Sequence, residues 1–420
     1  MSPLLGPILA QLVTLSLSDR TEGRYIASDD KYFEATTLPR AALNFGWKHT
    51  TLTLGYGPSL TVTPLAKDAQ LVVFHNAVVA TSYRWRRTTV AVSQAVGLGE
   101  VNFQTLALAD ARAGTTNVPA DKTGTGSAAP TPPANGGTTG APPPTMPGST
   151  MIPGAAQIRA RNGIITFATS STTLSMTQQL SPVLKLNGEL GYLITGSVGK
   201  NASADFPVVK GPRALAAASY SVTPRDAVTS SWSFQYAGSS TGVDSWVTVA
   251  SEGWAHAFDL HTNGRVSGGL SMTRTSQPDG LIAYSIYPTF SSAISHATPL
   301  DRGTLSYGFS AGAAPVLDPV RALVDPRVNL LASLGWGRDR FSTSLSAGSL
   351  LSLDKQNTAG ALSSASGALT LSYRLADALS VDGGVRTAWQ RFEGQTTVPL
   401  SWAAFVGLTY GVSIPFNGGI

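Results

Sequence analysis

Residues 173–192 read TLSMTQQLSPVLKLNGELGY, and this stretch decides the fold. Before Pro182, apolar residues alternate with Thr, Ser and Gln; after it, they alternate with Lys, Asn and Glu. Alternation with a period of two predicts a strand that has one apolar and one polar face. The short break at Pro182 predicts a tight turn, so the stretch is predicted to be an antiparallel β-hairpin.

The same alternation recurs along the whole chain. Counting the repeats gives about eighteen segments, and they dominate the sequence on both sides of one long interruption. Strands with one apolar and one wet face suit a wall that separates lipid from water. The clearest segments lie at 11–18, 43–47, 51–57, 90–96, 228–236, 305–310, 328–336, 369–373 and 406–412, and the fourth segment ends at 83–85.

The connections alternate in length. Short periplasmic turns and longer extracellular loops are typical of bacterial outer-membrane barrels. The pattern therefore predicts an all-β fold, a transmembrane antiparallel up-and-down β-barrel of about 18 strands in the bacterial outer membrane, with both termini periplasmic. Tight connections follow even-numbered segments near His49, Arg87, Pro182, Pro224, Asn263, Asp301, Arg338 and Asp377, and mostly longer ones follow odd-numbered segments around Asp29, Ala204, Val316, Asn357 and Thr396.

Aromatic residues agree with this orientation. Trp47, Trp85, Tyr220, Trp336 and Tyr373 each lie just before a predicted tight turn. Amphipathic rings favour the headgroup layer of a bilayer, where the ring is buried and its polar edge stays wet. These five residues are therefore predicted to form a belt at the periplasmic interface.

Composition excludes several other classes of protein. Of the 420 residues, 42% are hydrophobic and only 13% are charged, with 43 Gly, whereas charged residues make up about a quarter of soluble domains. The chain has no apolar run long enough for a transmembrane helix, which needs about 18 residues. With no Cys there is neither a disulfide scaffold nor a thiolate metal site, and the basic residues behind the net charge of +5 are too scattered for a nucleic-acid partner.

Two segments fall outside the predicted barrel wall, which spans 11–420. Residues 1–10 resemble the tail of a secretory signal peptide or are an apolar N-terminal tail. Residues 106–163 are rich in Pro, Gly and Thr and cannot bury enough apolar surface to offset the entropy of ordering. They are predicted to be a disordered extracellular loop within the barrel.

No motif predicts catalysis. Gly308-Phe-Ser-Ala-Gly312 matches the G-x-S-x-G pattern of serine hydrolases, but that pattern needs a strand-to-helix elbow, and here it lies within an alternating strand. The five histidines lack the spacing of a metal site. The sequence therefore predicts no enzyme activity, no metal and no cofactor. A membrane-barrel hydrolase with a Ser/His or Asp/His pair that is distant in the sequence stays the minor alternative.

The predicted lumen is where function is to be sought. Its residues are mostly Ser, Thr, Gly, Asn and Gln, which suits neutral, hydrated cargo such as saccharides; the alternative is that they merely keep the wall wet. An ion-selective pore would concentrate charge of one sign, whereas the charged candidates are mixed and dispersed. Trp246, Trp254 and Tyr287 are candidate sugar-stacking surfaces, and the pore-lining charged candidates are Lys48, Arg84, Arg86, Lys185, Glu189, Glu252, Arg374, Asp382 and Arg386.

The chain resembles bacterial outer-membrane β-barrels of the porin type. Tyr410, Val412, Ile414 and Phe416 echo the alternating C-terminal signal of that family, although four residues, 417–420, follow the last aromatic. The resemblance implies the barrel assembly machinery and outer-membrane lipid as partners. In size and strand number the chain also resembles the porin-like barrels associated with exopolysaccharide export, and this implies periplasmic polysaccharide-export proteins as partners.

Three functions follow from these observations. The first is an outer-membrane channel for hydrophilic solutes or polymers, with saccharide cargo and exopolysaccharide export as the specific hypothesis. The second is a general diffusion porin. The third is a structural or adhesive barrel that acts through its loops.

Overall fold

The chain forms a β-barrel in a computed structural model that describes residues 12–27, 31–63, 71–102, 164–199, 207–301, 303–317, 322–353, 361–392 and 400–417. The segments predicted as an N-terminal tail (1–10) and a disordered loop (106–163) lie outside the described residues. The strands are β1 (Leu12–Ala27), β2 (Lys31–Thr37), β3 (Arg40–Gly46), β4 (Thr50–Tyr56), β5 (Ser59–Val62), β6 (Leu71–Arg84), β7 (Thr88–Asn102), β8 (Ile164–Gln179), β9 (Leu184–Ser197), β10 (Val209–Ser221), β11 (Asp226–Ser239), β12 (Asp244–Ala257), β13 (Thr262–Ser276), β14 (Ile282–Leu300), β15 (Gly303–Leu317), β16 (Val324–Arg338), β17 (Phe341–Ser352), β18 (Ala361–Ala376), β19 (Leu379–Phe392) and β20 (Ser401–Asn417).

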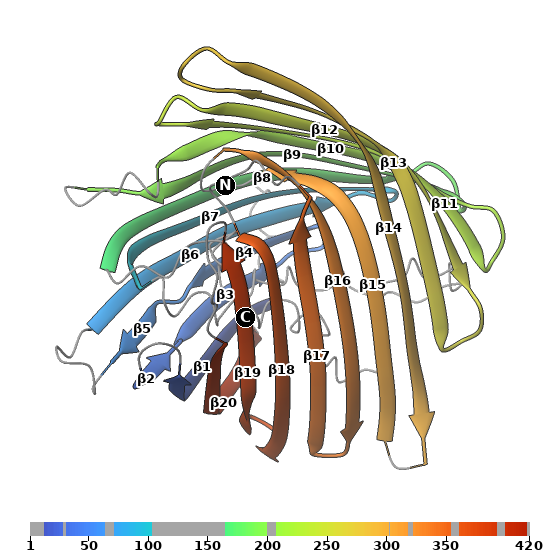
Figure 1. Ribbon diagram of the computed structural model, residues 1–420. Helices are drawn as coiled ribbons and strands as arrows, with labels where there is room; N and C mark the ends of the chain where they lie inside the picture. The colour runs from blue at the N-terminus through green and yellow to red at the C-terminus, as the bar shows by residue number, and fades with distance from the viewer. Residues whose placement is uncertain are drawn as a thin grey trace, which may run out of the picture.

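All strands belong to one antiparallel sheet that closes on itself. Strands that follow each other in the sequence pair in space, and β1 pairs with β20 along its full length, from Leu12 opposite Asn417 to Ala27 opposite Trp402. Figure 1 shows β1 and β20 side by side, with the other strands curving around the same cylinder. This confirms the predicted up-and-down barrel.

The twenty segments make eighteen continuous strands. β2 and β3 pair with β1 in a single register, and Pro39 separates them. β4 and β5 likewise pair with β6 in a single register on either side of Pro58. Proline has no N–H to donate, so each ladder is interrupted without the strand ending. The predicted strand number is therefore confirmed.

The tight connections lie where the sequence predicts them, with small corrections. The short connections at one end of the barrel are 47–49, 85–87, 180–183, 222–225, 258–261, 339–340 and 377–378, and Asp301 follows β14 at the same end. Asn263 lies in β13 rather than in the turn, and Val316 lies in β15 rather than in a loop. At the other end the rule of longer loops is not strict, because only three residues separate the end of β1 from the start of β2, and only four separate the end of β11 from the start of β12.

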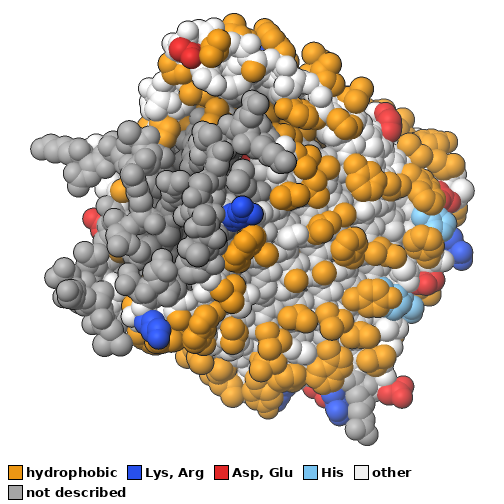
Figure 2. All heavy atoms as spheres, in the orientation of Figure 1, with side chains coloured by type: hydrophobic (Ala, Val, Ile, Leu, Met, Phe, Trp, Pro, Cys, Tyr) orange, Lys and Arg blue, Asp and Glu red, His pale blue; other side chains and the backbone are white. Residues whose placement is uncertain are grey.

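The two faces of the wall separate as the alternation predicts. Directly paired residues in an antiparallel sheet share a face, and Leu174 pairs with both Val92 and Leu190. The same register continues around the barrel and gathers the large exposed hydrophobic side chains on one face. Figure 2 shows these apolar side chains spread over the outer surface. The polar face consequently lines the interior.

One hairpin leaves the wall and folds inward. β14 pairs with β15 only as far as Phe290 opposite Ala313, and beyond this point β15 bends away from β14 (Figure 1). Continuing the register would set Pro288 opposite Pro315, and neither can donate a ladder hydrogen bond. The end of the β15–β16 hairpin instead packs Leu317 and Ala322 against other strands.

The strands that receive this hairpin are β10 to β12. Trp232 and Trp254 mark the even-numbered residues of β11 and β12 as the outer face, so odd-numbered residues face inward. The hairpin forms a buried apolar cluster with these inward residues. Its members are Val209, Ala237, Val247, Leu317 and Ala322. Leu317 and Ala322, at the described ends of this hairpin, therefore occupy part of the barrel interior.

Candidate functional site

Hydroxyl and amide groups dominate the inner face of the wall. Ser231 and Ser251 share a hydrogen bond of 2.8 Å across β11 and β12, and Ser245 donates to Thr275 at 2.9 Å. On β8 and β9, Thr177 donates to Asn187 at 3.0 Å. Neutral polar groups of this kind exchange hydrogen bonds with water and with sugar hydroxyls. Such a lining can accommodate a hydrated polymer without binding it tightly.

Five of the nine charged candidates gather at the tight-turn end. Lys48 and Arg86 lie in the turns 47–49 and 85–87. Arg84, Lys185 and Arg374 lie within a few residues of a turn, on strand positions that alternate with the outward Tyr83, Leu184 or Tyr373. The structure thus concentrates these cations at one mouth, whereas the sequence suggested dispersed charge.

Glu189 lies farther from the turn and is paired. Its Oε1 is 3.0 Å from Nη2 of Arg213, and both side chains are more than a third exposed. The same Arg213 nitrogen donates to Thr173 at 2.9 Å. Glu189 therefore belongs to the inner face as part of a solvated ion pair.

The structure does not bring Glu252 to the inner face. Glu252 pairs with Ser230 on β11 and with Gly268 on β13, in the same register that pairs Trp254 with Val228 and Val266. It consequently shares the apolar outer face, where it accepts a hydrogen bond of 2.7 Å from Ser230. The sequence analysis assigned Glu252 to the lumen together with Trp246 and Trp254. All three are even-numbered residues of β12, so they share one face, and the structure shows that this is the outer face. The same register places both tryptophans outside, so neither is a sugar-stacking surface in the lumen.

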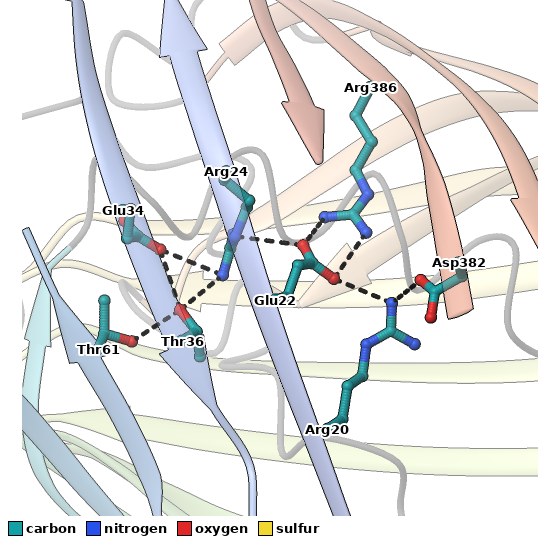
Figure 3. A network of polar contacts seen from close by, with 8 residues as sticks. All are labelled: Arg20, Glu22, Arg24, Glu34, Thr36, Thr61, Asp382 and Arg386. Carbon is teal, nitrogen blue, oxygen red and sulfur yellow. Dashed lines mark hydrogen bonds and ion pairs between the residues drawn. The ribbon is translucent and has the colours of Figure 1, made fainter. Parts of the chain in front are cut away.

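The last two candidates, Asp382 and Arg386, join a buried ionic network on the inner wall (Figure 3). Glu22 is its centre: its carboxylate accepts from Arg386 Nη1 at 2.9 Å and lies 2.9 Å from Arg20 Nη2. Nε of Arg24 lies 3.3 Å from the same carboxylate. Arg20 also pairs with Asp382, which ties β1 to β19. Three guanidinium groups therefore converge on one carboxylate.

The network continues from β1 onto β2 and β5. Nη2 of Arg24 lies 3.1 Å from Oε1 of Glu34 and donates to Thr36 at 3.0 Å. Thr36 in turn shares a hydrogen bond of 3.2 Å with Thr61. Glu34 is fully buried and Glu22 is 3% exposed. Buried charges must be paired to avoid a large desolvation cost, and these carboxylates face arginines.

Small residues on β20 let the network reach from β1 to β19 across the barrel seam, which is the β1–β20 pairing that closes the cylinder. Gly407 lies between Glu22 and Asp382, and Ala403 lies between Ile26 and Arg386. A Cβ at Gly407 would come within 3.2 Å of the Asp382 carboxylate. The guanidinium of Arg386 lies 3.8 Å from the ring centre of Phe405 on the same strand. The first strand and the penultimate strand are therefore joined over the last one.

The sequence analysis missed Arg20, Glu22, Arg24 and Glu34. It ended the first strand at residue 18, whereas β1 continues to Ala27. Arg20, Glu22 and Arg24 continue the polar alternation of Thr14, Ser16 and Ser18. That continuation was the available signal. The predicted barrel places the penultimate strand near the first, but nothing in the sequence indicated that Asp382 and Arg386 would contact Arg20 and Glu22 across β20.

A second buried ion pair lies on the inward hairpin. Arg327 Nε donates to Asp325 Oδ2 at 2.6 Å, and Ser352 donates to the other carboxylate oxygen at 2.6 Å. Asp325 and Arg327 are at most 5% exposed. The ion pair and the Ser352 hydrogen bond hold the start of β16 against the end of β17.

Gly308–Gly312 lies inside the paired strand β15, away from any elbow. Within the described ranges no group of acidic, His or Cys residues could hold a metal ion, and no helix there is long and apolar enough to cross a membrane.

A protein-family model described as the EpsX exopolysaccharide export family matches residues 26–413. No curated protein is similar enough to count as a match.

Solved structures resemble the chain as follows. OpdK, an outer-membrane protein of Pseudomonas aeruginosa, is 10% identical over 96% of this chain and 99% of its own, with a TM-score of 0.47. OccK5 (OpdH) of the same organism is 13% identical over 96% and 98%, with a TM-score of 0.44. The FrpB iron transporter of Neisseria meningitidis is 9% identical over 93% and 63%, with a TM-score of 0.49.

Proposed function

The chain belongs to the EpsX exopolysaccharide export family, and from this premise we propose that it is the outer-membrane conduit through which a saccharide polymer leaves the cell. The observation that carries the proposal is the closed eighteen-strand barrel with an apolar outside and a hydroxyl-rich inside. The family description names export rather than a chemical reaction. We assign the chain no catalytic role.

The orientation follows from the turns. Outer-membrane barrels place short turns in the periplasm and longer connections outside. Both described chain ends, Leu12 and Asn417, pair with each other at the tight-turn end next to Gly46. We therefore place both termini in the periplasm, where periplasmic polysaccharide-export proteins would deliver the polymer. Folding into the membrane would depend on the barrel assembly machinery.

Deletion and complementation in the source bacterium test the proposal. Loss of the protein should abolish extracellular polysaccharide, and the full chain supplied in trans should restore it. Unchanged polysaccharide with reduced uptake of small solutes would instead indicate a general diffusion porin. Normal polysaccharide and normal uptake, with lost surface adhesion, would indicate a structural or adhesive barrel.

The inward hairpin is proposed to narrow the channel. Leu317 is 4% exposed, and burying such a side chain contributes about 1.5–3 kcal/mol to holding the hairpin against β10–β12. Leu317→Asn should release this end of the hairpin and raise the single-channel conductance in planar bilayers. The adjacent Val316 is 43% exposed, so the uncharged change Val316→Asn is the matched control and should leave conductance unchanged. Equal conductance of both variants and the wild type would show that the hairpin does not restrict the channel.

A further inference from the structure

Three neighbouring tight turns carry a group of cations that we call the cationic arc. Its members are Lys48, Arg84, Arg86, Arg87 and Lys185. The turns adjoin one another, because Arg84 N donates to His49 O at 2.7 Å and Gln179 N donates to Arg87 O at 2.7 Å. Arg87 also donates from its side chain to Leu180 O at 3.4 Å. The arc is therefore one continuous part of the rim.

The strand residues of the arc are directed to the channel side. Tyr83 and Leu184 belong to the outer, apolar face. Arg84 and Lys185 occupy the alternate positions and consequently share the inner face. The arc residues are all exposed. A solute entering the barrel at this end would pass beside them.

The arc has no neutralising carboxylate among the described residues. The three turns 47–49, 85–87 and 180–183 contain no Asp or Glu, and no described ion pair involves an arc residue. The nearest acidic residue on these strands, Glu189, is paired with Arg213. Other tight turns are mixed: Asp339, for example, lies 3.5 Å from Arg338. Among the described tight turns, positive charge without an acidic residue in or next to the turn thus lies in one sector of the mouth.

We propose that the cationic arc binds the anionic groups of an acidic exopolysaccharide as the polymer enters the barrel. Arg and Lys recognise carboxylate, sulfate and phosphate groups through charge-assisted hydrogen bonds. An opening lined by one sign of charge concentrates ions of the opposite sign. The neutral hydroxyl wall beyond the arc then lets the polymer slide. This inference rests on the proposed function and adds the chemical class of the cargo.

The inner-face position of Arg84 and Lys185 favours a polymer in the channel over an acidic protein docked on the rim. A protein partner would meet Lys48, Arg86 and Arg87 in the turns but would not need cations turned toward the channel. The two occupants therefore predict different effects of removing Arg84 and Lys185.

Binding to purified protein in detergent tests the arc, with oligogalacturonate as the acidic probe and dextran of equal length as the neutral one. The wild type should bind oligogalacturonate about tenfold more tightly than dextran, and raising the salt from 0.1 to 1 M should abolish the difference. Arg84→Gln with Lys185→Gln should remove the preference. Arg338→Gln with Arg340→Gln, on the mixed turn, is the matched control and should retain it.

Three results would overturn the arc proposal: equal binding of both probes, a preference that survives in the Arg84/Lys185 variant, or a loss of preference in the control variant as well. Unchanged polysaccharide secretion together with unchanged oligogalacturonate binding in the Arg84/Lys185 variant would also overturn it, in favour of an acidic protein partner that contacts Lys48, Arg86 and Arg87 in the turns. Failure of the deletion strain to lose its polysaccharide is a separate result, and it would refute the proposed function instead.

Discussion

Glu22→Gln is expected to lower the free energy of unfolding by about 3–5 kcal/mol, the range found when one partner of a buried ionic group is removed. Glu22 is 3% exposed, and Arg20, Arg24 and Arg386 all lie within 3.3 Å of its carboxylate. Glutamine keeps the size of the side chain but removes the charge. The guanidinium groups would then remain in a desolvated position with too little negative charge around them.

The chain offers a matched control for this change. Glu189→Gln also removes a carboxylate from an arginine on the inner face, but Glu189 and Arg213 are 36% and 42% exposed at their side chains. An exposed pair contributes about 0–1 kcal/mol. Urea unfolding in lipid vesicles, followed by tryptophan fluorescence, measures both variants. Equal losses of stability would show that burial of the network does not determine its contribution.

Glu22→Gln should also act at the barrel seam. The network joins β1 to β19 across Gly407 of β20. If the network stabilises the closed barrel, a larger fraction of the Glu22→Gln protein than of the wild type should migrate as unfolded protein when the sample is not heated before electrophoresis. Glu189→Gln should migrate like the wild type, because its partner Arg213 lies on the neighbouring strand β10.

Leu330→Arg is expected to impair membrane assembly and to cost about 2–4 kcal/mol, the range for Arg on a barrel's lipid face near the bilayer midplane. Leu330 is on the outer face and 43% exposed. It lies six residues from Trp336, which is predicted to lie at the periplasmic interface, and this separation corresponds to about 15 Å of depth at the usual rise and tilt of barrel strands. A guanidinium at this depth cannot reach water without deforming the bilayer.

Ser333→Arg on the same strand is the control. Ser333 lies opposite Gly308 and Ser346 on the inner face, where the neighbours are small and water is accessible. It should assemble normally and change permeation instead. The pair Leu371→Arg and Ser372→Arg repeats the comparison on β18. The effect should be smaller there, because Leu371 lies only two residues from Tyr373, which is predicted to lie at the interface. Heat-modifiable mobility and outer-membrane yield measure assembly, and similar yields for Leu330→Arg and Ser333→Arg would contradict the assigned faces.

Local patterns in the sequence predicted which side chains of the wall face outward and which face inward, because each position in a strand carries a residue type suited to its surroundings. Leu174 and Met176 face lipid and Ser175 faces the interior, so alternation alone predicts their facing. The eight tight turns could be located for the same reason, since each is a break between two alternating segments. Glu252 escaped this reasoning because a polar residue on the outer face violates the pattern, and only its pairing with Ser230 and Gly268 reveals it.

The candidate site was less predictable. Asp382 and Arg386 were recognised as inner-face charges, but their partners Arg20 and Glu22 are more than 350 residues away in the chain. The inward hairpin was also missed, because Leu317 looks like any apolar strand residue until its contacts with Val209 and Val247 are known.

By itself, the sequence determined the eighteen alternating strands, the end of the barrel that carries the tight turns, and the lipid-facing side of nearly all of the strands. These are local properties, since the period of two and the turn residues act over a few positions. Only the tertiary structure decided which inner-face charges are paired, where the cations remain unneutralised, and that the β15–β16 hairpin enters the lumen. Ion pairing and packing depend on distances between strands, and barrel closure sets those distances by bringing β1 and β19 together over β20.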